Sequence, residues 1–175
     1  MSEALRVVGR PGRVAAPRVV AETFEEFFHR EKEGLYGALC LVTRNQHEAE
    51  ELTQDAFVRV LERWDRVRAM EDPRSYLYRT AMNAFRRSYR RALLAAKRTV
   101  GVAAVDDEMA AVDELDATVR ALARLSARQR AAVILTDLLG FGSEDAARIL
   151  GIRASTLRMH ASRAHAALKE GMTRD

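Results

Sequence analysis

The chain has 175 residues, a length that suits one domain or two small ones, and its formal net charge is +4. Hydrophobic residues make up 48% of it, an ordinary share for a globular protein, which argues against a chain that is disordered throughout. The single cysteine, Cys40, excludes an internal disulfide, and no apolar run approaches the roughly 18 residues that span a bilayer, so we expect no membrane insertion.

Residues 1–20 are expected to form a flexible basic tail. They hold four arginines and a single acid, Glu3, and they lack the continuous apolar run of a secretory signal. Gly9, Pro11 and Gly12 also disfavour the amphipathic helix of a transit peptide.

Three helices are predicted between residues 23 and 98. Thr23 and Glu26 have the T-x-x-E spacing of a capping box, and aromatic and aliphatic residues follow them at helical intervals. Asn45 begins a second helix, on which one apolar stripe is expected to carry Ala49, Leu52, Ala56, Val60 and Trp64. Asp72 and Pro73 read as the N-cap and first residue of a third helix that runs to about Arg98.

The third predicted helix, residues 73–98, has the strongest charge pattern of the chain. It carries eight Lys or Arg residues and no acid, with Tyr76, Tyr78, Phe85 and Tyr89 interleaved. Such cations neutralise phosphates, and aromatic rings stack on unpaired bases, so the segment favours nucleic-acid contact. The alternative is a solvated basic face whose aromatics belong to the core.

A change of composition separates a second helical block. Residues 99–116 contain six acids and no Lys or Arg, and we interpret them as a flexible acidic linker whose end feeds a helix from about Val112 to Leu125. Ser126 and Gln129 repeat the capping-box spacing, and helices are predicted over residues 127–139, 144–150 and 154–169.

The last two of these helices have the spacing of a helix-turn-helix. In A-A-R-I-L-G-I-R-A-S-T-L a short amphipathic helix ends at Gly151, and a second helix starts a few residues later. The second helix carries apolar residues at helical intervals, which are expected to pack against the first helix. Its opposite, polar face is then left for DNA. A plain helical hairpin is the alternative. The sequence thus predicts an all-α fold of two small helical domains joined by a flexible acidic linker, with the helix-turn-helix in the second.

Three segments together resemble the RNA polymerase sigma factors of the sigma-70 family, in the extracytoplasmic-function (ECF) group. H-E-A-E-E-L-T-Q-D-A-F-V-R-V-L-E-R-W resembles the helix that docks on core polymerase. D-P-R-S-Y-L-Y-R-T-A-M-N-A-F-R-R-S-Y-R-R resembles the segment that recognises and melts the −10 element. L-S-A-R-Q-R-A-A-V-I-L with the helix-turn-helix resembles the −35-binding domain. The likeness covers about Phe24 to Glu170, with the segments in the family's order.

The resemblance implies partners and residue roles. Residues 21–98 would form domain 2, and residues 117–175 would form domain 4. Core polymerase would be bound by Glu51, Gln54, Asp55 and Arg59. The −10 element would be contacted by Arg79, Asn83, Arg86, Arg87, Tyr89 and Arg90. The −35 element would be contacted by Arg153, Ser155, Thr156, Arg158, His160 and Arg163.

The same resemblance implies a cytoplasmic protein with no catalytic residues, cofactor or metal of its own, because the polymerase performs the chemistry. An anti-sigma factor is a further candidate partner, since the group is commonly regulated by one. An autonomous helix-turn-helix repressor or activator is the alternative, but it would leave the basic-aromatic segment unexplained. An enzyme is disfavoured, since the four histidines form no H-E-x-x-H and neither a Walker loop nor a nucleophile elbow occurs.

Three departures from the family pattern affect the base-reading segments. Arg87 stands where the −10 segment often has an acid, and His160 stands where the recognition helix usually has an arginine. Arg153 also takes the place of a serine that would cap the helix better. We therefore expect base preferences that differ from the usual pattern, most of all at −35.

Overall fold

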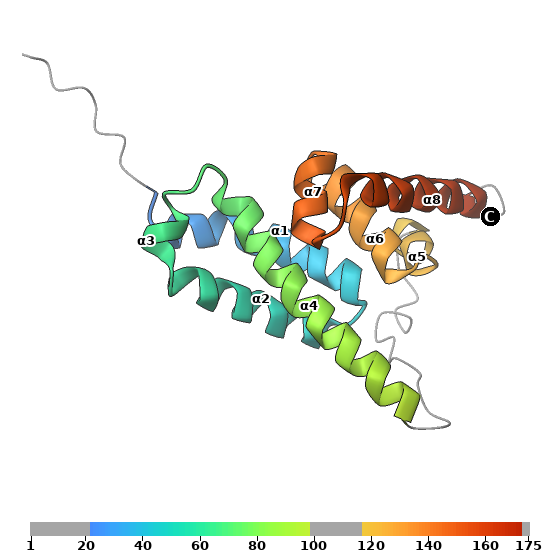
Figure 1. The fold of residues 1–175 in the computed structure, drawn as a ribbon, viewed down its shortest axis with the longest axis horizontal. Coiled ribbons are helices and arrows are strands. Elements are labelled where there is room, and N and C mark those ends of the chain that lie inside the picture. Colours follow the sequence, from blue (N-terminus) through green and yellow to red (C-terminus); the bar gives the residue numbers. More distant parts are fainter. Residues whose placement is uncertain (1–21, 99–116, 173–175) are drawn as a thin grey trace, which may run out of the picture.

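The computed structural model describes residues 22–98 and 117–172, and every regular element in them is a helix (Figure 1). The expected basic tail and acidic linker lie outside the described residues. The elements are α1 (Phe24–Thr43), α2 (Gln46–Leu61), α3 (Trp64–Val67), α4 (Pro73–Arg98), α5 (Ala117–Ala123), α6 (Ala127–Val133), the π-helical η2 (Ile134–Leu138), α7 (Ser143–Leu150) and α8 (Ala154–Met172). None of the described helices is long and apolar enough to cross a membrane.

The predicted helix starts are confirmed by their caps. The Thr23 hydroxyl accepts a hydrogen bond from the Glu26 amide at 3.2 Å, and the Glu26 carboxylate accepts one from the Thr23 amide at 2.8 Å. Ser126 and Gln129 form the same reciprocal pair at α6. The Asn45 side chain accepts from the Glu48 amide at 2.8 Å. Each cap satisfies amides that have no partner within the helix, which fixes where the helix begins.

Two helix boundaries differ from the sequence expectation. Trp64 is not on the stripe of α2, because α2 ends at Leu61 and Trp64 begins the short α3. The break lets the indole pack against the rings of Phe24 and Phe27, at centroid distances of 5.6 and 5.1 Å. The helix predicted over residues 127–139 is also divided, because its second half winds as the π-helix η2.

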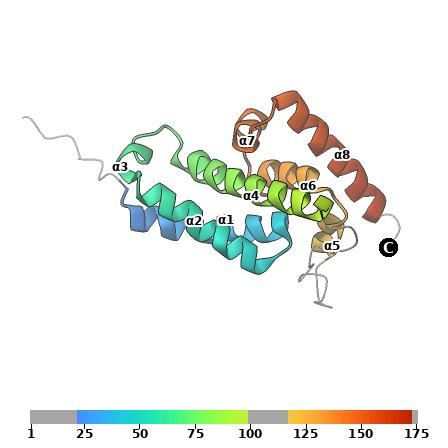
Figure 2. The same cartoon turned by 60° about the horizontal axis from the view of Figure 1, so that its bottom comes forward.

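The two helical units share one hydrophobic core. Helices α1, α2 and α4 surround fully buried residues such as Phe27, Leu39 and Met82, and the same continuous cluster includes Ile149 and Leu157 of α7 and α8. In both Figure 1 and Figure 2, α4 lies between α2 and α7. Helix α4 therefore has one face in the first unit and another against the second.

Candidate nucleic-acid interface

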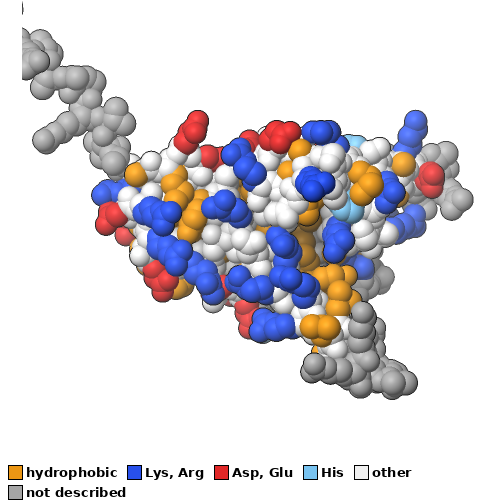
Figure 3. All heavy atoms as spheres, in the orientation of Figure 1, with side chains coloured by type: hydrophobic (Ala, Val, Ile, Leu, Met, Phe, Trp, Pro, Cys, Tyr) orange, Lys and Arg blue, Asp and Glu red, His pale blue; other side chains and the backbone are white. Residues whose placement is uncertain are grey.

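The basic helix α4 presents cations and one aromatic ring to solvent. Of its predicted DNA contacts, Arg79, Arg87, Tyr89 and Arg90 are exposed, whereas Asn83 and Arg86 are half-buried. Lysine and arginine side chains spread over this face of the molecule (Figure 3). Tyr78 and Phe85 are buried, so for these two rings the core interpretation is correct. Tyr89, 41% exposed, is the ring best placed to stack on an unpaired base.

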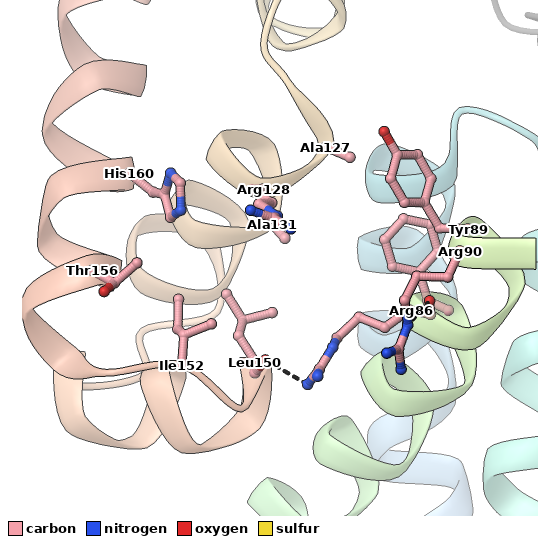
Figure 4. Close-up of a pocket in the computed structure, with 11 residues that line it drawn as sticks. Arg86, Tyr89, Arg90, Ala127, Arg128, Ala131, Leu150, Ile152, Thr156 and His160 are labelled. Atoms are coloured by element: carbon pink, nitrogen blue, oxygen red, sulfur yellow. Dashed lines mark hydrogen bonds between the residues drawn. The ribbon is translucent and has the colours of Figure 1, made fainter. Parts of the chain in front are cut away.

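Arg86 points from α4 toward the helix-turn-helix. Its guanidinium donates a 2.7 Å hydrogen bond to the carbonyl of Leu150 and a 3.4 Å one to the Asn83 side chain. Arg86, Tyr89 and Arg90 form one wall of a cavity of about 280 Å³, and the opposite wall carries Thr156 and His160 (Figure 4). The structure thus brings predicted −10 residues and predicted −35 residues to a single cavity.

The helix-turn-helix forms as the sequence predicts. Helix α7 ends at Leu150, and Gly151 adopts the left-handed conformation at φ 62°, which a glycine occupies without steric cost. Leu157 and Ala164 of α8 are fully buried, as expected for its inward face. The outer face carries four exposed predicted contacts, which are Arg153, Ser155, Arg158 and Arg163.

His160 differs from these four in its surroundings. It is half-buried, and burial together with the nearby cations Arg128 and Arg163 lowers its pKa below the ordinary histidine value. Arg86 and Arg90 of α4 line the same cavity, and no carboxylate is among its described lining residues. The neutral imidazole is therefore favoured here, and the cavity has an excess of positive charge.

Helix α2 carries the residues that the resemblance assigns to polymerase docking. Glu51, Gln54 and Arg59 are exposed and Asp55 is half-buried. Arg59 donates through Nε to both oxygens of Asp55, at 3.0 and 2.9 Å. Glu51, Asp55 and Arg59 line a groove of about 690 Å³ whose other side carries Arg87 and Arg90 of α4, whereas Gln54 is not among its lining residues.

A cluster around Arg74 joins the two units and was not found from the sequence. Arg74 lies on α4, donates to the Leu139 carbonyl at 3.1 Å, and pairs with the buried Glu31 of α1 at 3.3 Å. Its guanidinium also covers the ring of Phe141, 4.4 Å from the centroid. Phe141 in turn meets the ring of Tyr78 edge-on at 5.2 Å.

One sequence signal could have pointed to this cluster. Glu31 falls between Phe27 and Leu35 at intervals of four, which places an acid on the apolar face of α1. Such an acid needs a cationic partner, because a buried charge without one is strongly unfavourable. The adjacent Arg30 supplies one partner, with its Nε 2.9 Å from the Glu31 carboxylate. The second partner, Arg74, depends on tertiary contacts, which the sequence pattern does not show.

Comparison with known proteins identifies the family. The sigma-70 region 2 model matches residues 27–93, and the sigma-70 region 4 model matches residues 115–168. The chain is 32% identical over 146 residues to the ECF RNA polymerase sigma factor SigM of Mycobacterium tuberculosis, a match that covers 83% of this chain and 74% of that relative.

Solved structures agree with this match. The fold is similar to the sigma factor RpoE in complex with the anti-sigma factor NepR from Bartonella quintana, with a TM-score of 0.71, 27% identity, and coverage of 87% of this chain and 98% of that one. It is also similar in fold to CnrH in complex with the cytosolic domain of CnrY, with a TM-score of 0.59, 22% identity, and coverage of 87% and 88%. The chain therefore belongs to the ECF sigma factors, the alternative sigma factors that bind core RNA polymerase and direct it to initiate transcription at promoters.

Proposed function

We propose that the two helical units of this sigma factor divide promoter recognition between them. Residues 21–98 serve as domain 2, which docks on core polymerase and recognises the −10 element. Residues 117–175 serve as domain 4, which binds the −35 element through the helix-turn-helix. Residues 99–116 connect them, and residues 1–20 form a basic tail. The single observation that carries this proposal is the order of the parts: an exposed mixed-charge helix, an acid-free basic helix and a helix-turn-helix.

In this proposal α2 supplies the polymerase contact. Glu51, Gln54, Asp55 and Arg59 would dock on the clamp helices of the largest polymerase subunit, as the family resemblance implies. Support comes from their place on one helix, where both charge signs reach solvent and are free to pair across an interface. The Asp55–Arg59 pair is half exposed, so exchanging it for partner contacts costs little.

The −10 element is the proposed ligand of α4. Tyr89 offers a ring for stacking on a flipped non-template base, a contact worth roughly 1–3 kcal/mol per base. Arg79, Arg87 and Arg90 hold the phosphates of the opened strand, while Asn83 and Arg86 supply hydrogen bonds at base edges. No acid lies on α4 to repel the strand.

The −35 element is the proposed ligand of α8. Arg153, Ser155, Arg158 and Arg163 are exposed at and after its N-terminus, where a recognition helix meets the major groove. Thr156 and His160 belong to the same set but face the cavity against α4.

Three further statements belong to this proposal. The chain performs no covalent chemistry of its own, because the polymerase does so. It acts in the cytoplasm, where the polymerase is. It also takes an anti-sigma partner, a proposal supported by the fold that it shares with RpoE, which was solved with NepR, and with CnrH, which was solved with CnrY.

The test is reconstitution with core polymerase. The purified chain plus core should give promoter-specific transcripts, and mapping transcript starts after overexpression should yield aligned −35 and −10 sequences. Tight operator binding without core, and no such transcripts, would instead identify an autonomous regulator.

Variants test the division of labour. Arg86→Ala with Arg90→Ala should impair open-complex formation much more than core binding. Arg124→Ala removes an exposed cation that lies on neither α4 nor α8, and it should affect neither step. Equal loss of core binding in the α4 variant would contradict the assigned roles.

A further inference from the structure

The outward face of α8 has an uncharged centre with an arginine on each side. Successive residues of a helix are about 100° apart, so positions 155, 159, 162 and 166 lie on one line along it. This line faces away from the buried Leu157 and Ala164. Arg158 and Arg163 lie on its two sides, and both are exposed. The line itself consists of the exposed residues Ser155, Met159, Ser162 and Ala166.

Met159 is the one long side chain on this line. It is 40% exposed, whereas the other members of the line are two serines and an alanine, whose side chains are short. Neither hydrophobic cluster of the described residues includes Met159, and the inward packing of α8 is supplied by residues such as Leu157 and Ala164. The thioether therefore does not belong to the core, and it projects from the middle of the outward face.

A single exposed apolar residue is ordinary on a protein surface, but the position of Met159 gives it a meaning. It lies in the second turn of α8, which begins at Ala154. In a docked helix-turn-helix, the residues near the start of the second helix meet base edges in the major groove. The short side chains of Ser155 and Ser162 let the helix axis come close to the floor of the groove, which brings Met159 to those edges.

The chemistry of the major groove offers this side chain one partner. Base edges there present hydrogen-bond donors and acceptors, and the apolar group among them is the C5 methyl of thymine. A methionine side chain has no donor and only a weakly accepting sulfur, so it satisfies none of the polar edges. Against guanine or cytosine it would remove water from polar atoms without replacing their hydrogen bonds, which is unfavourable. Against thymine it buries a methyl group.

We infer that Met159 selects a thymine in the −35 element by packing its thioether chain on the C5 methyl group. The inference rests on the proposed assignment of α8 to that element. Burial of one methyl group changes a binding constant by about fourfold. The flanking arginines carry the charge that attracts the duplex, so Met159 adds a preference for one base pair without adding to the salt dependence of binding.

The test removes the methyl group from the DNA and the thioether from the protein. Holoenzyme is titrated with a labelled promoter fragment, defined by transcript mapping, in which each thymine of the −35 element is replaced singly by deoxyuridine. Deoxyuridine keeps the hydrogen bonds of thymine and lacks only its methyl group. At one position the unsubstituted chain should bind the deoxyuridine fragment about fourfold more weakly. Met159→Ala should bind the thymine fragment about fourfold more weakly, with no further loss when deoxyuridine stands at that position.

Two further variants separate apolar contact from shape. Met159→Leu keeps an apolar side chain and should keep the discrimination against deoxyuridine. Met159→Gln has a similar length but a polar end, and it should lose that discrimination. Leu138→Ala is the control for loss of an exposed apolar side chain elsewhere, since Leu138 is 62% exposed on η2, and it should change neither affinity nor discrimination. Helical circular dichroism should stay the same in all four variants, because both positions are exposed.

The outcomes separate this inference from the proposed function. A Met159→Ala chain that still loses affinity with deoxyuridine at every sensitive position overturns the inference, as does a −35 element without an A·T pair. If Arg158→Ala and Arg163→Ala weaken promoter binding but neither deoxyuridine nor Met159→Ala does, α8 reads the −35 element without Met159. If none of these variants changes promoter binding, the assignment of α8 fails and the role of Met159 fails with it.

Discussion

The guanidinium of Arg86 on α4 caps the carbonyl of Leu150, the last residue of α7, at 2.7 Å. The last carbonyls of a helix lack partners within it and carry partial negative charge, so a cation there is favourable. Gly151 follows with its left-handed backbone, and a Cβ at that position would clash with the Arg86 Nη1. A side chain expected to contact DNA therefore also completes the bracing helix of the helix-turn-helix.

Arg86→Ala should lower the free energy of unfolding by about 1 kcal/mol. This is less than the roughly 1.5–3 kcal/mol of a hydrogen bond to a charged group, because Arg86 is only half-buried. Arg87→Ala is the matched control, since Arg87 is the next residue of α4 and is exposed. Its effect should stay within about 0.5 kcal/mol. Urea unfolding at constant salt measures both, and equal effects would show that the Leu150 contact adds nothing.

Arg130→Met should be more damaging, with a loss of about 2–3 kcal/mol. Arg130 is 6% exposed and donates to the carbonyls of Leu122 and Leu125, at 3.3 and 3.4 Å, where α5 ends. Burial and the nearby Arg44 lower its pKa to about 10, so it is still protonated near neutral pH. Methionine would fill the space but leave both carbonyls without this donor.

The control for Arg130 is Arg128→Met, because Arg128 lies on the same helix and is exposed. Thermal unfolding followed by circular dichroism compares the two variants. A loss in the control as large as in Arg130→Met would mean that helix propensity or net charge is responsible, and not the bonds to α5.

Local chemistry explains which parts of the fold were predictable. Thr23, Asn45 and Ser126 cap helices through residues three positions away, so their pattern is visible in the sequence. Trp64 was placed wrongly because its spacing continues the α2 stripe, and only the ring contacts with Phe24 and Phe27 reveal the break.

The candidate site was predictable only where it depends on local sequence pattern. The exposed arginines of α4 and α8 follow from helical spacing and charge. The contacts of Arg74 with Leu139 and of Arg86 with Leu150 join residues more than 60 positions apart. No periodicity encodes such pairings, so the packing of the two units against each other emerged only from the structure.

His160 should make the chain less stable in mild acid. Burial and the cations Arg128 and Arg163 depress its folded pKa below the ordinary value of 6.5, so between these two values the unfolded chain binds more protons. The stability is present above about pH 6.5 and is lost as the pH falls toward the folded pKa. His160→Gln should therefore flatten the difference between urea unfolding at about pH 7.5 and about pH 5.5.

His29→Gln serves as the control for the pH experiment, because His29 is exposed on α1. It should keep the pH dependence of the unsubstituted chain. If both variants retain the same acid sensitivity, the cations around the cavity do not act through His160.

The salt dependence of promoter binding by the holoenzyme should separate phosphate contacts from base contacts on α8. Log affinity falls with log salt by about 0.9 per neutralised phosphate, so a variant that loses one such contact has a slope smaller by about that amount. Arg153→Ala, Arg158→Ala and Arg163→Ala should each be compared with Arg124→Ala, which removes an exposed cation that is not on α8.

A variant that weakens binding without changing the slope identifies an arginine that reads a base, because that contact releases no phosphate counterion. Arg158 is the residue for which this outcome is expected, since Glu144 of α7 lies 3.6 Å from its guanidinium and directs it. Unchanged affinity and slope in all three variants would remove α8 from the −35 contact altogether.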